Sequence, residues 1–246
     1  MLPYFYSYIY HMNRVILLCF LSLCIFNYVN AQEESVNTFI DDKYREDQFY
    51  AGFSYSMLSK LPEDTKLRGL SGSIQFGFLR DIPINKKRNI ALAVGVGLNF
   101  NRYGQNLFIG KDGDKQMIYR VLGKEGPVQY STNRLGTSIV EFPIQFRWRT
   151  SSADKYQFWR IYGGVTAGYL YWSRSTFKQS ENTVIVTKIP DIQKLRWSAT
   201  LSFGYNKINF FAKYDLNNLF QKEVYTTDGT LIEIRPLQFG FIFYIL

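Results

Sequence analysis

Alternation of large apolar residues with small or polar residues constrains this chain more than any other feature. In residues 90–101, every even position from Ile90 to Phe100 is large and apolar, whereas the odd positions are Ala, Gly or Asn. Successive side chains of a β-strand point to opposite faces, so this period of two predicts a strand with one apolar face. The same pattern predicts eight strands, at residues 49–57, 70–78, 90–101, 140–149, 159–171, 195–205, 208–216 and 237–245.

The connections between these segments alternate in length. Short connections are expected at 83–89, 150–157 and 206–207, and longer ones at 60–68, 105–133, 174–194 and 220–230. An even number of strands joined by short turns on one side and longer loops on the other is typical of outer-membrane barrels. We therefore predict an all-β fold, an eight-stranded antiparallel up-and-down transmembrane β-barrel over residues 48–246.

A soluble barrel of the lipocalin type, with an apolar interior, is the alternative. The transmembrane form is favoured because large rings suit a lipid-facing surface, whereas small residues and paired ions suit a narrow lumen. Aromatic residues near the strand ends predict a girdle at each membrane surface. Its expected members are Trp148 and Trp159 beside one short connection, and Tyr103, Tyr171 and Tyr214 near the opposite ends.

The first 31 residues have the layout of a cleavable export signal. Arg14 provides a short basic region, residues 15–26 are apolar, and Ala31 precedes the expected cleavage before Gln32. Met12 is the better start of this signal, and 32–47 is expected to be a short periplasmic leader. The apolar stretch is shorter than the ~18 residues of a spanning helix, which disfavours the alternative of an N-terminal membrane anchor. The predicted location is the bacterial outer membrane.

Both cysteines, Cys19 and Cys24, and the single histidine, His11, lie in this predicted signal. The exported chain would therefore lack disulfides, thiolate or imidazole metal sites and any histidine-dependent catalysis. We expect no enzyme activity, no cofactor and no metal. The segment 111–115 (KDGDK) carries only two carboxylates, fewer than the 6–8 oxygens that Ca²⁺ takes, and predicts a glycine-centred turn.

The formal net charge is +9, but the basic residues are scattered along the chain. Without a basic stripe or a nucleic-acid motif, nucleic-acid binding is disfavoured. The expected partners are outer-membrane lipid and envelope or secretion-machinery proteins. Apolar residues within 105–133 predict either an extension of the strands beyond the membrane or a docking site for a protein partner.

Residues 140–148 (VEFPIQFRW) resemble a recurring strand of PorT-like outer-membrane β-barrel proteins. Residues 45–52 (REDQFYAG), 158–164 (FWRIYGG) and 243–246 (FYIL) are also similar to that family. The family is described as porin-like, and its name-giving member belongs to a secretion system of gliding-type bacteria. The resemblance implies a barrel with structural rather than catalytic motifs, and a link to protein secretion or surface assembly.

Charged residues on the face expected to line the lumen are the candidate functional residues. They are Glu141, Arg147, Arg149, Arg160, Arg196, Lys213 and Asp215. A buried charge is costly unless it is paired, so one hypothesis is a structural plug in which the acids neutralise the neighbouring bases. The alternative is a basic constriction that selects anions. The predicted function is accordingly a non-enzymatic structural or accessory envelope protein, with a narrow, weakly anion-preferring channel as the alternative.

Overall fold

The computed structural model describes residues 48–123, 128–150, 159–180, 182–205 and 208–245. The predicted export signal at 1–31 and the predicted leader at 32–47 lie outside the described residues. Within the described ranges, no helix has the length and apolar character needed to cross a membrane.

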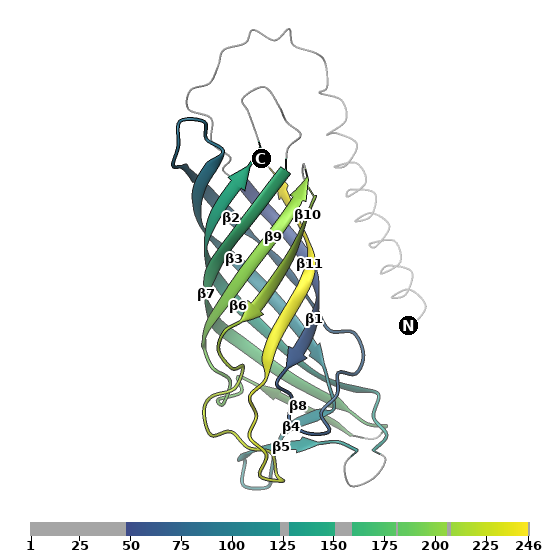
Figure 1. The fold of residues 1–246 in the computed structure, drawn as a ribbon. Helices are drawn as coiled ribbons and strands as arrows, with labels where there is room; N and C mark the ends of the chain where they lie inside the picture. The colour runs from purple at the N-terminus through teal and green to yellow at the C-terminus, as the bar shows by residue number, and fades with distance from the viewer. Residues whose placement is uncertain (1–47, 124–127, 151–158, 181, 206–207, 246) are drawn as a thin grey trace, which may run out of the picture. The chain divides into compact units, whose positions relative to one another are not determined.

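The described chain forms eleven strands (Figure 1). Their bounds are β1 Gln48–Ser59, β2 Gly72–Pro83, β3 Ile90–Gly104, β4 Leu107–Lys111, β5 Met117–Val121, β6 Thr132–Arg149, β7 Trp159–Lys178, β8 Thr183–Thr187, β9 Leu195–Tyr205, β10 Ile208–Asp215 and β11 Arg235–Ile245.

Eight of these strands close into an antiparallel barrel. The order is β6-β3-β2-β1-β11-β10-β9-β7, and the pairing of β6 with β7 closes the ring. The first and last strands pair along their length, from Phe49 opposite Ile245 to Ser59 opposite Arg235. The predicted all-β, eight-stranded fold is confirmed. We call the end of the barrel where Pro83, Ile90, Arg149, Trp159, Tyr205 and Ile208 lie the turn end, and the opposite end the loop end.

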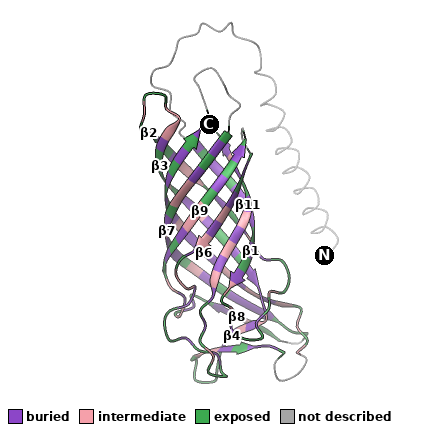
Figure 2. Cartoon of the chain, viewed as in Figure 1, coloured by how far each residue is buried: buried purple, intermediate pink, exposed green. Residues whose placement is uncertain are grey.

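Burial alternates along the barrel strands (Figure 2). Large apolar side chains face outward on every strand; for example, Phe53, Leu201 and Phe203 are 54%, 60% and 54% exposed. The inner face carries Ser, Thr, Asn, Gln and charged residues, and these are buried. This arrangement is the inverse of a lipocalin, whose interior is apolar. It matches a barrel that presents its apolar face to lipid.

The connections at the loop end fold into a packed layer, which we call the cap. The cap consists of β4, β5, β8 and the segments 60–71, 188–194 and 216–234. Its apolar side chains form one buried cluster with inward-facing residues of the barrel, including Tyr103, Leu135 and Leu170. The backbone also joins separate connections, as the amide of Gln193 donates to the carbonyl oxygen of Leu219 over 2.9 Å.

The cap corrects the expectation that residues 105–133 extend the barrel strands. β3 and β6 do lengthen toward the loop end, but β4 and β5 pair only with each other, as a separate two-stranded sheet. Leu107, Ile109 and Tyr119 are buried in the apolar cluster, so these side chains stabilise the cap. Residues 111–115 form the turn of this hairpin, and the left-handed residue there is Lys115 (φ 64°) rather than the glycine.

Candidate functional site

All seven predicted lumen charges are buried inside the barrel. β6 supplies Glu141, Arg147 and Arg149, at alternate positions of one strand. Arg160 comes from β7, Arg196 from β9, and Lys213 and Asp215 from β10. Because the side-chain period of a strand is two, the outward packing of the large apolar residues sets the inward direction of these charges.

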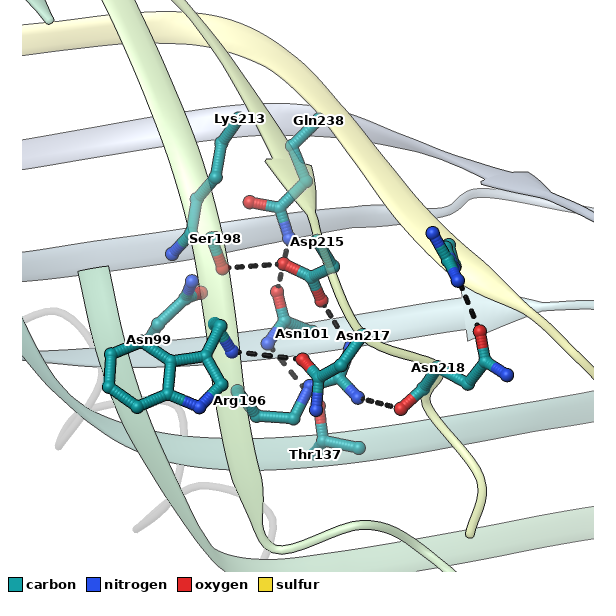
Figure 3. Close-up of polar contacts among 12 residues, drawn as sticks. Asn99, Asn101, Thr137, Arg196, Ser198, Lys213, Asp215, Asn217, Asn218 and Gln238 are labelled. Atoms are coloured by element: carbon teal, nitrogen blue, oxygen red, sulfur yellow. Dashed lines mark hydrogen bonds and ion pairs between the residues drawn. The ribbon is translucent and has the colours of Figure 1, made fainter. Parts of the chain in front are cut away.

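The cluster nearest the loop end is built around Asp215 (Figure 3). The Arg196 guanidinium donates to Asp215 Oδ2 over 2.5 Å, and the Ser198 hydroxyl donates to Asp215 Oδ1 over 2.7 Å. Arg196 also donates to the backbone carbonyl of Asn218, which follows β10. Arg196 on β9 is thereby bonded both to Asp215 on β10 and to the start of the segment 216–234.

A second polar chain crosses the barrel at nearly the same level (Figure 3). The Gln238 side-chain amide donates to Asn101 Oδ1 over 2.7 Å, and Asn101 donates to the Thr137 hydroxyl over 3.2 Å. These three residues come from β11, β3 and β6, which are not all neighbours in the sheet. Side chains therefore bridge the lumen from one wall to another at this level.

Glu141 and Lys213 form the next pair toward the turn end. The Lys213 ammonium lies 2.5 Å from Glu141 Oε1, and the Asn99 side-chain amide donates to the same oxygen over 2.8 Å. The Lys213 and Glu141 side chains are 5% and 7% exposed. A cavity of about 30 Å³ borders this pair. That volume accommodates about one water molecule.

Below this pair, bulky side chains fill the lumen. Tyr50, Tyr162, Phe211, Ile242 and Tyr244 belong to one buried cluster. Glycine is required beside them at Gly97, because a Cβ there would overlap the Tyr50 hydroxyl. The absence of a side chain at Gly97 therefore leaves room for the Tyr50 ring at the centre of the barrel.

The cluster at the turn end is built around Asp81, a residue that the sequence analysis missed. Its Oδ1 accepts from Arg147 over 3.2 Å and its Oδ2 accepts from Arg149 over 2.9 Å; all three side chains are fully buried. The Arg147 guanidinium also lies over the Tyr162 ring, 4.7 Å from its centroid. Gln75 and Gly77 are expected on the inner face at alternate positions of this strand. Extending the same alternation by four residues would have placed Asp81 on the inner face as well.

Of the predicted girdle, Trp148, Trp159 and Tyr171 are outward and 38%, 56% and 47% exposed. Tyr214 is half-buried on the same outer face of β10. Tyr103 is an error of the prediction: it is 2% exposed and belongs to the apolar cluster under the cap. Its odd position on β3 places it on the inner face with Asn99 and Asn101.

The closed barrel, its apolar outer face and its filled polar lumen define a class, the small integral membrane β-barrels. Residues 30–221 match the family described as outer membrane protein beta-barrel domain, and the chain belongs to this family. The protein is therefore located in the bacterial outer membrane. The turn end corresponds to the periplasmic side and the loop end to the outside.

Two solved structures similar to this chain are both of Ail, the attachment invasion locus protein of Yersinia pestis. The structure of Ail with the heparin analogue sucrose octasulfate has 12% identity and a TM-score of 0.35, covering 81% of this chain and 99% of Ail. The structure of Ail alone has 12% identity and a TM-score of 0.36, covering 81% and 97%. No curated protein matches this chain.

Proposed function

We propose that this protein is a non-enzymatic, non-conducting structural or accessory component of the outer membrane. The observation that carries the proposal is the filling of the lumen at successive levels. From the loop end these levels are the apolar cap, the Asp215 cluster, the Glu141–Lys213 pair, the aromatic cluster and the Asp81 cluster. A conducting pore needs a continuous aqueous path, and the cavity beside Glu141 holds about one water molecule.

The lack of Cys and His after residue 24 supports a non-enzymatic role, since nucleophile–imidazole pairs and thiolate chemistry have no donor there. The buried carboxylates are likewise engaged by Arg, Lys, Ser or Asn side chains. A role in holding the barrel together accounts for these contacts.

Protein secretion or surface assembly is the process that we propose for this component. The support is the resemblance of residues 140–148 and the other quoted segments to PorT-like proteins. Affinity purification of the tagged protein from its native membrane in mild detergent, followed by mass spectrometry, tests this part. Reproducible recovery of secretion or surface-assembly proteins supports it, and recovery of the barrel alone contradicts it.

A narrow anion-preferring channel is the competing function, and one observation favours it. Among the residues that the structure describes, the lumen holds five basic side chains against three acidic ones, counting Asp81, so their summed formal charge is positive. Conductance in planar bilayers separates the two functions. We expect the purified, folded protein to give no discrete openings, whereas anion-selective steps would overturn the non-conducting proposal.

Two controls make a silent bilayer informative. Heat-modifiable mobility on a denaturing gel shows that the protein is folded, and co-reconstitution with a known porin shows that the bilayer accepts barrels. The variant Lys213→Met/Glu141→Leu gives a third comparison, because it removes the central ion pair while keeping bulky side chains. It is also expected to be silent, since the aromatic cluster still fills the lumen.

A further inference from the structure

Two outward arginines lie in a single cross-strand row near the loop end. Tyr55 on β1 pairs with Gly72 on β2, and Gly72 pairs with Arg102 on β3. Arg102 pairs in turn with Gly136 on β6, which pairs with Arg174 on β7. Neighbouring strands are about 4.8 Å apart, so the backbones of the two arginines are separated by about 10 Å, with only a glycine between them.

The charge of this row is uncompensated on the barrel surface. Arg102 and Arg174 are exposed, and Arg134, which faces the same side on β6, is half-buried. Within the described part of the chain, none of these three guanidinium groups has an ion-pair partner. The acidic residues of the eight barrel strands, Asp81, Glu141 and Asp215, all face inward.

On β3 and β7, the row lies where the large outward apolar side chains end. On β3, Phe100 is the last large apolar residue before Arg102, and on β7, Tyr171 and Trp172 come just before Arg174. Phe100 and Tyr171 are 38% and 47% exposed on the lipid-facing side. Cations at the border of a lipid-facing surface can reach lipid headgroups, and guanidinium groups bind phosphate through paired hydrogen bonds.

An apolar groove of about 530 Å³ adjoins Arg102 on the same face. Gly72 and Arg102 are both among the residues that line it. Its other walls are mostly apolar and include Phe53, Leu70, Ile74, Phe100 and Phe241. These walls are chemically suited to a hydrocarbon chain rather than to a polar ligand.

We propose that this face binds a phosphorylated, acylated glycolipid of the outer leaflet. Arg102 and Arg174 hold its phosphate groups, with Arg134 adding positive charge, and an acyl chain occupies the groove over Gly72. This binding goes beyond the proposed function and does not depend on whether the lumen conducts.

Native mass spectrometry of the whole protein in a neutral detergent tests the proposal. The probes are bis-phosphorylated lipid A and the same lipid after removal of both phosphates. The variant Arg102→Gln/Arg174→Gln is expected to bind the phosphorylated lipid about 25-fold more weakly, at about fivefold for each cation near a lipid headgroup. Its binding of the dephosphorylated lipid should equal that of the unaltered protein.

The matched control is Lys111→Gln/Arg120→Gln, which removes two exposed positive charges from the β4–β5 hairpin. It should bind both lipids as the unaltered protein does. Leu70→Ala, at a 73% exposed position outside the strands, should weaken binding of both lipids by opening the groove. Heat-modifiable mobility verifies that each variant is folded.

Equal binding of phosphorylated lipid by the Arg102→Gln/Arg174→Gln variant and the unaltered protein would overturn the proposal. Equal weakening by the control pair would overturn it as well, because general charge attraction would then explain binding. Two results together would reject a lipid site. They are displacement of lipid A by an equimolar amount of glucosamine 1-phosphate, which has no acyl chain, and unchanged lipid binding by the Leu70→Ala variant. The arginines would then bind a phosphate group without an acyl chain in the groove.

Discussion

Asp81 shows that the buried charges on the inner face of the barrel are paired residue by residue. One carboxylate accepts from two fully buried guanidinium groups, Arg147 and Arg149. Removing a buried charge from water costs several kcal/mol, and its partners must offset that cost. The intact cluster therefore adds little net stability, but removing one member destabilises the protein strongly because the other charges are left buried and unpaired.

The variant Asp81→Asn is expected to destabilise the barrel by about 3–5 kcal/mol, because Arg147 and Arg149 lose their shared carboxylate. The temperature at which the folded band disappears in heat-modifiable electrophoresis provides the measurement. Asp114→Asn, at an exposed position in the β4–β5 turn, is the control and should melt as the unaltered protein does. An unchanged melting temperature for Asp81→Asn would show that the two arginines do not depend on this carboxylate.

Glu141→Ala should lower the melting temperature because it leaves the Lys213 ammonium buried without its carboxylate. The double variant Glu141→Leu/Lys213→Met should recover most of the loss, since an apolar pair of similar size replaces a buried ion pair at little cost. The two variants are compared by the same electrophoretic melting assay. If the double variant is as unstable as Glu141→Ala, the hydrogen bond from Asn99 rather than charge pairing dominates at this site.

At the scale of strands, alternation predicted the barrel well and failed where the pattern itself changed. Each of the eight expected segments overlaps one barrel strand, but β2 begins at Gly72 rather than residue 70 and continues to Pro83 rather than ending at residue 78, and β10 ends at Asp215 rather than residue 216. There Leu79 faces inward and Arg80 outward, reversing the usual distribution of apolar and polar residues. Pairing of Arg80 with Val94 and Asp81 with Ala93 continues the strand despite this reversal.

The cap could not be predicted from local patterns, because contacts between distant connections hold it together. The Tyr119 hydroxyl on β5 donates to Asp191 Oδ2 over 2.7 Å, and the Thr227 amide donates to the Tyr119 carbonyl. These partners are separated by about 70 and 110 positions, beyond the range of any periodicity. A short alternating segment such as Met117–Val121 therefore suggests a longer barrel strand when it is instead a hairpin of the cap.

Tyr119 should make the cap sensitive to alkaline pH. Burial, together with the hydrogen bond to Asp191 and the charge of that carboxylate, raises the pKa of Tyr119 above its usual value of 10.0. The folded cap thus holds the phenol proton more tightly than the unfolded cap. This contribution to stability is complete below about pH 10 and is lost progressively as the pH rises further.

Limited proteolysis of the cap between pH 8 and pH 11 measures this dependence, with the cleavage rate of an unfolded substrate as the reference. Cleavage should accelerate above about pH 10 in the unaltered protein. Tyr119→Phe should abolish this part of the acceleration while lowering stability at pH 8 through the lost hydrogen bond. The same pH dependence in both proteins would assign the acceleration to other groups.

For the whole molecule, the main feature is that separate groups of side chains occupy the lumen at successive levels. The cap is an apolar cluster, whereas the Asp215, Glu141 and Asp81 clusters are polar and have no side chain in common, although β10 serves the first two and β6 the last two. Removing one level leaves the others in place. The cap is therefore expected to be a folded outer surface of the protein rather than a gate.

Replacement of residues 107–121 by a short Gly-Ser linker should leave the barrel folded and still non-conducting. The reason is that the Asp215, Glu141 and aromatic clusters below the hairpin remain intact. Electrophoretic mobility checks the fold, and planar-bilayer recording checks conductance. Discrete openings in this variant would instead identify the hairpin as the barrier to ion flow.

The pairing of β1 with β11 has a consequence for how the molecule is made. Eleven consecutive pairs, from Phe49–Ile245 to Ser59–Arg235, join the first and last strands of the barrel. Until β1 and β11 pair with each other, each of them is an open sheet edge with unsatisfied backbone groups and outward phenylalanines. An incomplete barrel can therefore pair with a second chain through the same edges, so misassembly competes with closure until the ring is sealed.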